Sequence, residues 1–83
     1  MKISKVIIQT GFYKHYKGKR YFVAGMAKNS ETLEDMVIYS ALYNSPEFGD
    51  NVTWVRPAKM FLEEVEVDGK KVPRFVLMTE SEK

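Results

Sequence analysis

The chain has 83 residues, which allows one domain, and a chain this short buries only about 60–65% of the surface that its unfolded form exposes. These limits exclude a two-domain enzyme, a dinucleotide-binding domain joined to a second domain, and an eightfold β/α barrel. The composition, with 45% hydrophobic and 29% charged residues, is that of a globular protein, and the absence of Cys excludes disulfides, thiolate zinc sites and cysteine nucleophiles.

The net charge of +2 is distributed unevenly along the chain. Residues 1–28 hold seven basic residues and no acidic one, whereas residues 29–83 hold six basic residues and all eleven acidic ones. This asymmetry favours an anionic partner for the first third of the chain, although a fold that mixes the two segments would cancel the field. The apolar run over residues 6–8 is too short for a signal peptide or a spanning helix, so we expect a cytoplasmic protein that makes no membrane contact.

The first half of the chain predicts three β-strands. Residues 11–16 and 20–28 are rich in β-branched and aromatic residues and flank a turn at Gly18, which predicts a hairpin. A polar turn over residues 29–32 precedes a third strand over residues 36–43. Apolar residues occupy both faces of the second and third strands, which indicates either that both faces are covered or that one is an exposed apolar patch with a function.

The second half of the chain alternates turns with short strands. Residues 45–49 predict one helical turn, because Ser can cap it, Pro suits its first position and Gly ends it. Residues 53–56 predict a short strand that halts before a proline, and residues 58–61 predict a single tight turn. Residues 63–67 and 70–78 flank an Asp-Gly pair, which predicts a hairpin with a type I′ turn.

These elements predict a mainly β fold, a small SH3-like antiparallel barrel or roll of five to six short strands with one short helical turn. A strongly bent sheet of this size reduces its exposed edges most easily by closing. The expected organisation is a lead segment over residues 1–10, a single SH3-like domain over residues 11–78 and a polar tail over residues 79–83.

Several segments, in the same order along the chain, resemble a bacterial family. They are residues 11–18 (GFYKHYKG) with Tyr21, residues 30–32 (SET), then Val37, Tyr39, Leu42 and Tyr43, residues 54–57 (WVRP) with Met60 and Phe61, residues 67–70 (VDGK) and residues 72–75 (VPRF). Over about residues 11–76 the chain resembles the DUF1653 family, a domain of unknown function. The resemblance implies a small SH3-type β-barrel roll, and it implies no established activity, substrate or cofactor. The ten-residue lead and a longer loop over residues 44–53 depart from the family pattern.

Basic and aromatic residues alternate over residues 14–21, near the expected hairpin tip. Grooves that bind nucleic acid need cations for phosphates and ring faces for bases, so this segment is a candidate for gripping a single strand. The alternative is an ordinary solvated β-turn whose tyrosines pack inward. His15, the only histidine, lacks the companions that a metal site or a general base needs, so we expect a structural or surface hydrogen-bonding role, with ligand contact as the alternative.

Other aromatic residues and two arginines could form a site farther along the chain. Tyr and Trp suit a binding face because each has an apolar body and a polar tip, although a purely core role is the alternative. The aromatic candidates for a shared surface or shallow pocket are Tyr13, Tyr39, Tyr43 and Trp54. Arg56 and Arg74 each lie next to a proline, and a guanidinium held in this way can bind a carboxylate or a phosphate. The same geometry serves an internal salt bridge, for which the candidate partners are Glu31, Glu63 and Glu64.

We therefore expect a non-enzymatic binding module that recognises an anionic partner, with nucleic acid favoured, through aromatic and basic surface residues. The alternatives are a module for protein–protein interaction or self-association and a small-molecule-binding regulatory domain. No catalytic residue, metal or cofactor is expected, and the oligomeric state is expected to be a monomer or a weak homodimer. The candidate binding residues are Tyr13, His15, Tyr16, Lys17, Arg20, Tyr39, Trp54 and Arg56.

Overall fold

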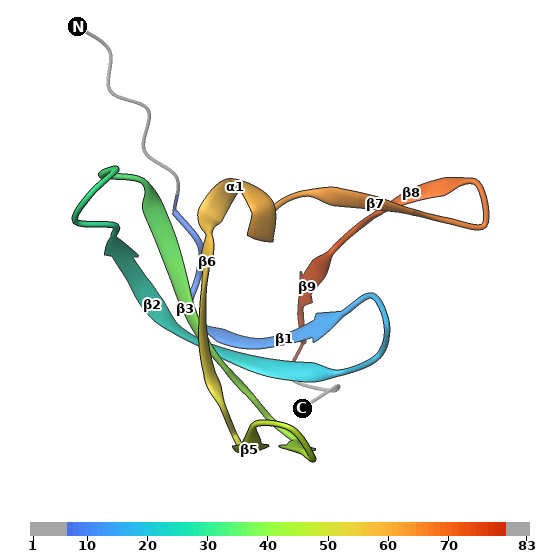
Figure 1. The fold of residues 1–83 in the computed structure, drawn as a ribbon. Helices are drawn as coiled ribbons and strands as arrows, with labels where there is room; N and C mark the ends of the chain where they lie inside the picture. Colours follow the sequence, from blue (N-terminus) through green and yellow to red (C-terminus); the bar gives the residue numbers. More distant parts are fainter. Residues whose placement is uncertain (1–6, 80–83) are drawn as a thin grey trace, which may run out of the picture.

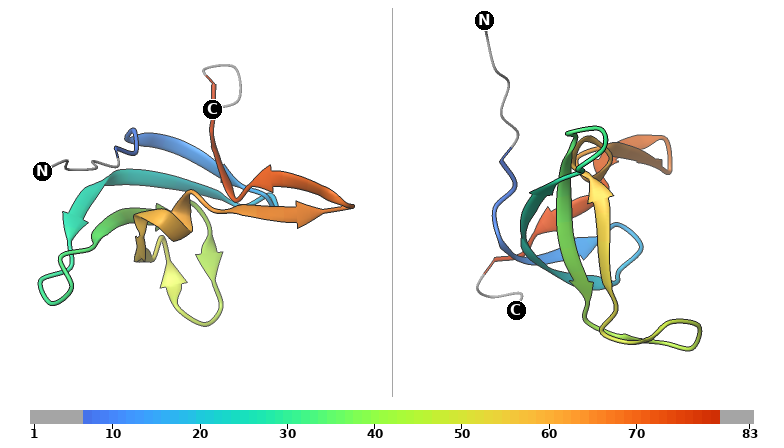
Figure 2. Two further views of the ribbon diagram at one scale, coloured as in Figure 1. Left: turned by 90° about the horizontal axis from the view of Figure 1, so that it is seen from above. Right: turned by 60° about the vertical axis from the view of Figure 1, so that its left-hand side comes forward.

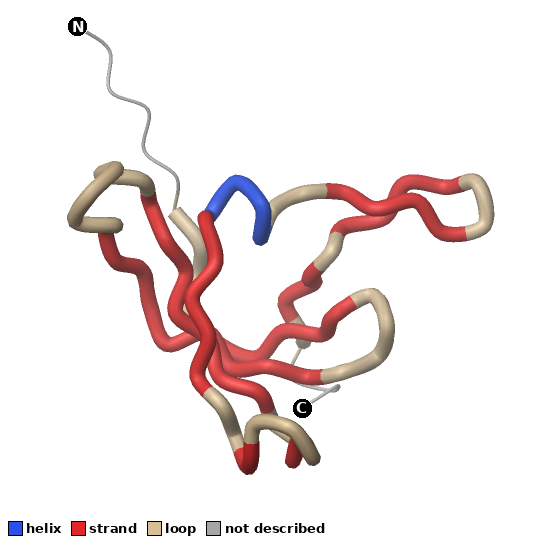
Figure 3. Tube along the Cα trace, in the orientation of Figure 1, coloured by secondary structure: helices blue, strands red, loops and turns tan. Residues whose placement is uncertain are grey.

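The computed structural model describes residues 7–79, so residues 1–6 of the predicted lead and residues 80–83 of the predicted tail lie outside the described part. Strands account for most of the described chain, and the single helix is one turn long (Figure 3). The elements in chain order are β1 (Gly11–His15), β2 (Arg20–Lys28), β3 (Asp35–Ala41), β4 (Asn44–Ser45), β5 (Gly49–Asp50), β6 (Thr53–Pro57), α1 (Ala58–Phe61), β7 (Glu64–Val67), β8 (Lys70–Pro73) and β9 (Phe75–Leu77).

Five strands form one antiparallel sheet in the order β6-β3-β2-β1-β9, and two small two-stranded sheets join β4 to β5 and β7 to β8 (Figure 1). The predicted mainly β, antiparallel fold with one short helical turn is therefore confirmed. Within residues 7–79, β6 and β9 are the edges of the large sheet and no pairing joins them, so the closed SH3-like barrel stays a prediction. The β7–β8 hairpin extends away from the large sheet in every view (Figure 2).

The pairing register divides the large sheet into two faces. Tyr13 lies opposite Tyr21 on one face, which we call the inner face, and Phe12 lies opposite Phe22 on the other, the outer face. A β-bulge between Val23 and Gly25 shifts the register of β2 against β3.

The bulge changes which residues of β2 share a face. Strict alternation along residues 20–28 would put Met26 on the face opposite Val23. In the structure Val23 pairs with Tyr39 and Met26 pairs with Val37, and both partners are buried on the inner face. The extra residue of the bulge therefore brings Met26 onto the core side.

The core lies on the inner face beneath α1. Phe61 of this helix is only 2% exposed, and its ring stacks on Phe75 with ring centroids 4.2 Å apart and an interplanar angle of 4°. Burying a phenylalanine in this way contributes about 1.5–3 kcal/mol of transfer free energy. The core cluster consists of Ile8, Tyr13, Val23, Val37, Tyr39, Ala58, Phe61 and Phe75.

The helical turn lies at a different place from the predicted one. Residues 45–49 form no helix; they belong to the small β4–β5 hairpin, in which the Ser45 hydroxyl accepts the N–H groups of Glu47 and Phe48 at 3.3 and 3.2 Å. The predicted serine cap thus serves a β-turn. The helix is α1, where a tight turn was predicted, and it begins directly after Pro57, whose φ of −53° suits a helix start.

The Asp-Gly hairpin and its flanking strands show a second difference. Asp68 and Gly69 have φ values of 52° and 78°, as a type I′ turn requires, so the predicted hairpin is confirmed. The predicted strand over residues 70–78 is instead two strands, because the chain leaves the hairpin after Pro73 and joins the large sheet as β9. Pro73 has no N–H to continue the first ladder.

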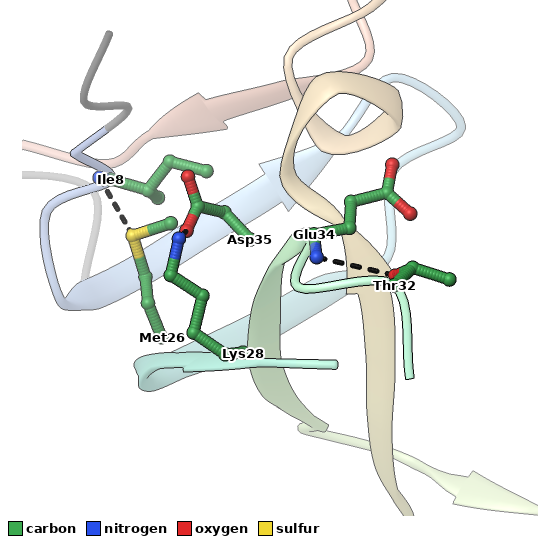
Figure 4. A network of polar contacts seen from close by, with 6 residues as sticks. All are labelled: Ile8, Met26, Lys28, Thr32, Glu34 and Asp35. Atoms are coloured by element: carbon green, nitrogen blue, oxygen red, sulfur yellow. Dashed lines mark hydrogen bonds and ion pairs between the residues drawn. The ribbon is translucent and has the colours of Figure 1, made fainter. Parts of the chain in front are cut away.

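Local polar contacts fix the turn between β2 and β3. Asn29 Oδ1 accepts the N–H groups of Glu31 and Thr32, and Thr32 Oγ1 accepts the N–H of Glu34. An ion pair of 2.8 Å joins Lys28 to Asp35 across the base of the turn (Figure 4). The predicted polar turn is confirmed, and the side chains of Asn29 and Thr32 hold its backbone.

Candidate anion-binding site

The inner face of the sheet carries a group of aromatic and basic side chains next to the core. They come from strands far apart in the sequence, which the antiparallel pairing brings side by side. We call this group the arginine–tyrosine site; its residues are His15, Tyr21, Tyr39, Tyr43, Arg56, Arg74 and Phe75. Tyr21 is the centre of its ring contacts, with centroids 5.4 Å from Tyr39, 5.6 Å from Tyr43 and 5.7 Å from Phe75.

Arg56 is the residue of the site that is best oriented for an anion. Its Nε donates to the hydroxyl of Tyr39 at 3.1 Å, and its Cζ lies 6.0 Å from the ring centroid of Phe75. No acidic side chain in residues 7–79 forms an ion pair with Arg56, and its Nη atoms have no partner there. Its guanidinium therefore offers a fixed fork of N–H donors for a phosphate or carboxylate.

Arg74 is tied to an acid. Its Nη2 donates to Glu63 Oε1 at 2.8 Å, and its backbone N–H donates to the carbonyl of Glu63 at 3.0 Å. The predicted internal salt bridge is therefore present for Arg74 and absent for Arg56 among the described residues. The Nε of Arg74 is buried without a hydrogen-bond partner, which leaves a donor of this cation unsatisfied.

His15 is packed between rings at the end of β1. Its ring centroid lies 4.9 Å from that of Phe75 and 4.5 Å from that of Tyr16. Burial lowers the pKa of His15, and the positive charges of Arg74, Arg56 and Lys17 lower it further. The imidazole is therefore neutral at pH 7. Its Nδ1 accepts the N–H of Lys17 at 3.2 Å, which assigns the proton to Nε2 and makes Nε2 a donor.

A hydrogen bond of 2.7 Å joins the hydroxyls of Tyr21 and Tyr43. Burial raises the pKa of Tyr21 well above its usual value, and the bond to Tyr43 raises it further. The ammonium of Lys19 lies 4.6 Å from the ring centroid of Tyr43. The positive charge of Arg56 acts in the opposite direction on the pKa of Tyr21, so the hydroxyl of Tyr21 lies near this guanidinium.

Trp54 extends the site along β6. It pairs with Tyr39 and is separated from Arg56 by one residue, so the two side chains share the inner face. The indole is 36% exposed and meets the ring of Phe48 edge to face, with centroids 5.3 Å apart. A partly exposed indole whose angle is fixed by a second ring is suited to stack against a planar group.

The described residues carry no sign of a metal site or a membrane span. No three His, Asp or Glu side chains in residues 7–79 come together in an arrangement that could hold a metal ion. The same part of the chain has no helix with the length and apolar character needed to cross a bilayer.

Similarity to known proteins places the chain in a family. The model of the family described as "Protein of unknown function (DUF1653)" matches residues 11–77. The chain belongs to the DUF1653 family. A crystal structure of a DUF1653 protein from Bordetella bronchiseptica is similar to this chain, with 31% sequence identity and a TM-score of 0.76; the similarity covers 86% of this chain and 87% of that one. No curated protein shows significant similarity.

Every residue of the arginine–tyrosine site lies within the segment that matches the DUF1653 model. Three of the eight candidate residues, His15, Tyr39 and Arg56, belong to the site itself, and Trp54 adjoins it. Lys17 lies in the turn after β1, and its charge acts on His15. Tyr16 lies in the same turn, packs on His15 and is 38% exposed.

Two candidates of this DUF1653 chain lie elsewhere. Tyr13 is 7% exposed, its ring packs on Phe61, and its hydroxyl donates to the carbonyl of Gln9 at 2.7 Å, so it belongs to the core. Arg20 pairs with Lys14 on the outer face, because it directly precedes the inward-facing Tyr21 in β2. The charge of Arg20 is therefore separated from the site by the sheet.

Two residues of this DUF1653 site, Tyr21 and Phe75, were not among the candidates. Tyr43 was predicted as part of a shared aromatic surface and Arg74 as an anion binder, although neither is among the eight final candidate residues. Phe75 lies after a proline near the end of a predicted strand, and no periodicity shows that the strand breaks there and enters the large sheet beside His15. Arg74 was predicted from its neighbouring proline, and its salt bridge to Glu63 is the alternative that the sequence left open.

Proposed function

We propose that this DUF1653 domain binds single-stranded nucleic acid at the arginine–tyrosine site, with a phosphate on Arg56 and a base against Trp54. The observation that carries the proposal is the guanidinium of Arg56, which is oriented by Tyr39 and has no acidic partner among the described residues. A preorganised, unpaired fork of donors loses little conformational entropy when it binds a phosphate.

The surroundings of Arg56 favour an anion that carries a planar group. Basic side chains at and around the site outnumber acidic ones. Glu63 is bound to Arg74, whereas the ammonium groups of Lys17 and Lys19 lie over the rings of Tyr16 and Tyr43. Trp54 offers an exposed ring beside the fork. Proteins that bind single strands without strong sequence preference combine these features, cations along the backbone and rings for the bases.

The proposed function is binding without a chemical step. A general base needs a free lone pair within reach of a proton, and in His15 the Nδ1 lone pair accepts a backbone N–H while Nε2 carries the proton. The cytoplasmic location expected from the sequence agrees with a nucleic-acid ligand.

The fluorescence of Trp54 provides a direct test, because it is the only tryptophan of the chain. Titration with a short thymidine or uridine oligonucleotide should quench the indole and should give an affinity that falls steeply with salt. Arg56→Gln should weaken binding about tenfold or more, since a hydrogen bond to a charged group contributes about 1.5–3 kcal/mol. Arg56→Lys should recover only part of the loss, because an ammonium keeps the charge and lacks the fork.

Arg20→Gln is the matched control. It removes the same charge from the other face of the sheet and should change the affinity about twofold or less. Equal losses in the two variants would show diffuse attraction and would contradict the proposal. Binding of a duplex as tightly as of a single strand, or an affinity that does not depend on salt, would contradict it as well.

A further inference from the structure

The outer face of the sheet holds a cavity that the proposed function does not use. Its volume is about 160 Å³, and the described residues that line it are Phe12, Arg20, Leu42 and Met78. Three of these are apolar and the fourth is a cation. Arg20 forms no ion pair with an acid of residues 7–79.

The walls of this outer-face cavity are held by the backbone. The N–H of Met78 donates to the carbonyl of Phe12 at 2.8 Å, and the N–H of Leu42 donates to the carbonyl of Arg20 at 3.0 Å. The ring of Phe12 also rests edge to face on Phe22, with centroids 5.1 Å apart. Because backbone bonds fix the wall residues in pairs, the cavity is largely formed before a ligand arrives, as small-molecule sites usually are.

The size and lining of the cavity restrict what can enter it. An apolar cavity of about 150 Å³ accepts a benzene ring, so one ring or a short aliphatic chain fits here. A thioether wall such as Met78 adapts to irregular apolar groups.

The positive charges beside the cavity favour an apolar ligand that carries a negative charge. Lys14 is the cross-strand partner of Arg20, so two cations stand together on the outer face, and no acid is among the described lining residues. A carboxylate on the ligand would bind the Arg20 guanidinium, where it loses less hydration than in a fully buried site because Arg20 is exposed.

A second hollow, beside α1, has a different electrostatic character. It is lined by Glu34, Asp35, Ala58 and Lys59 and has a volume of about 230 Å³. Its charged groups are already paired, Asp35 with Lys28 at 2.8 Å (Figure 4) and Glu34 with Lys59 at 3.7 Å. The outer-face cavity differs because its cation is unpaired among the described residues.

We infer that the outer-face cavity binds a small amphiphilic carboxylate, whose ring or short chain enters between Phe12, Leu42 and Met78 while its carboxylate pairs with Arg20. This site lies on the opposite face of the sheet from the arginine–tyrosine site. The inference therefore does not depend on nucleic-acid binding.

Benzoate is the probe, and amide NMR of the whole chain is the measurement. Titration should shift the amide signals of Phe12, Leu42 and Met78 in a saturable way, with an affinity in the millimolar range that is usual for a ligand of this size. Benzyl alcohol, which has the same ring without the charge, should bind about tenfold more weakly, and benzylamine should not bind.

Two variants locate the binding and separate it from the proposed function. Arg20→Gln should reduce the affinity for benzoate about tenfold and should leave that for benzyl alcohol unchanged, a result that a mere loss of folding would not give. Arg56→Gln should leave benzoate binding unchanged. Equal affinities of benzoate and benzyl alcohol, shifts centred on Arg56, or the absence of saturable shifts would each overturn the inference.

Discussion

The two faces of the large sheet are built from the same strands, and they differ in how their polar side chains are bonded. On the inner face the polar groups are bonded to one another, Arg56 to Tyr39 and Tyr21 to Tyr43, and next to this face Arg74 is bonded to Glu63. On the outer face, Lys14 and Arg20 stand beside apolar side chains and form no ion pair within the described residues. Alternate residues of one strand can therefore supply a bonded polar site on one face of the sheet and an apolar cavity beside these cations on the other.

The largest expected effect concerns the core beneath α1. Phe61→Ala should lower the free energy of unfolding by about 3–5 kcal/mol, because it removes a stacked, buried ring and leaves a cavity. Leu62→Ala, at the next residue and 55% exposed, should cost less than about 1 kcal/mol. Urea denaturation of both variants measures the difference, and similar losses would show that α1 does not close the core.

Two valines on neighbouring strands compare the faces directly. Val37 of β3 is fully buried on the inner face, while Val55 of β6 is 61% exposed on the outer face. Val37→Ala should cost about 2 kcal/mol of unfolding free energy and Val55→Ala less than about 0.5 kcal/mol. A large loss from Val55→Ala in the monomer would show that the outer face is covered. A loss that appears only at high protein concentration would favour the weak homodimer over the monomer, the two oligomeric states that the sequence left open.

The hydroxyl pair of the inner face gives a smaller effect. Tyr43→Phe removes the partner of the Tyr21 hydroxyl and should cost about 1 kcal/mol. The pKa of Tyr21 should fall toward its usual value without reaching it, because burial, the larger cause of its rise, remains. Alkaline titration of tyrosine absorbance measures this change. An unchanged titration would show that the bond between the hydroxyls contributes nothing to the raised pKa.

The smallest expected effect is the one of pH on the free energy of unfolding through His15. The pKa of His15 in the folded chain lies below the ordinary value of 6.5, so the unfolded chain takes up the proton first as the pH falls. The stability that His15 contributes is therefore present above about pH 6.5 and is lost as the pH falls through the folded-state pKa. His15→Asn should show a smaller loss of unfolding free energy between about pH 7 and about pH 5 than the parent chain. An equal loss in both would assign the acid effect to other groups.

The sequence predicted the strands well and the site in part, for physical reasons that particular residues illustrate. The hairpin at Asp68 and Gly69 follows from local backbone preference, so the prediction is confirmed. The face of Met26 depends on a bulge, which leaves no mark in the alternation of side chains. The contact between His15 and Phe75 depends on long-range pairing of β1 with β9, and no local pattern specifies it.

The identification of the candidate residues shows the same limit. Arg20 and Lys17 are near in sequence and equally basic, yet only Lys17 is close enough to the site to lower the pKa of His15. Composition can predict a cationic hairpin, whereas the side of the sheet that each cation occupies follows from register.

The β7–β8 arm makes no pairing with the large sheet in the described chain, and a lone two-stranded ribbon is marginally stable in water. The ion pair between Arg74 and Glu63 holds together the two ends of this arm, at the border of the arginine–tyrosine site. An anion that binds Arg74 as well as Arg56 would compete with that carboxylate, and we expect it to weaken the contact at the base of the arm. Amide hydrogen exchange in residues 64–73 should then become faster when the ligand binds. Binding at the arginine–tyrosine site would in this way change the local stability of the whole β7–β8 hairpin.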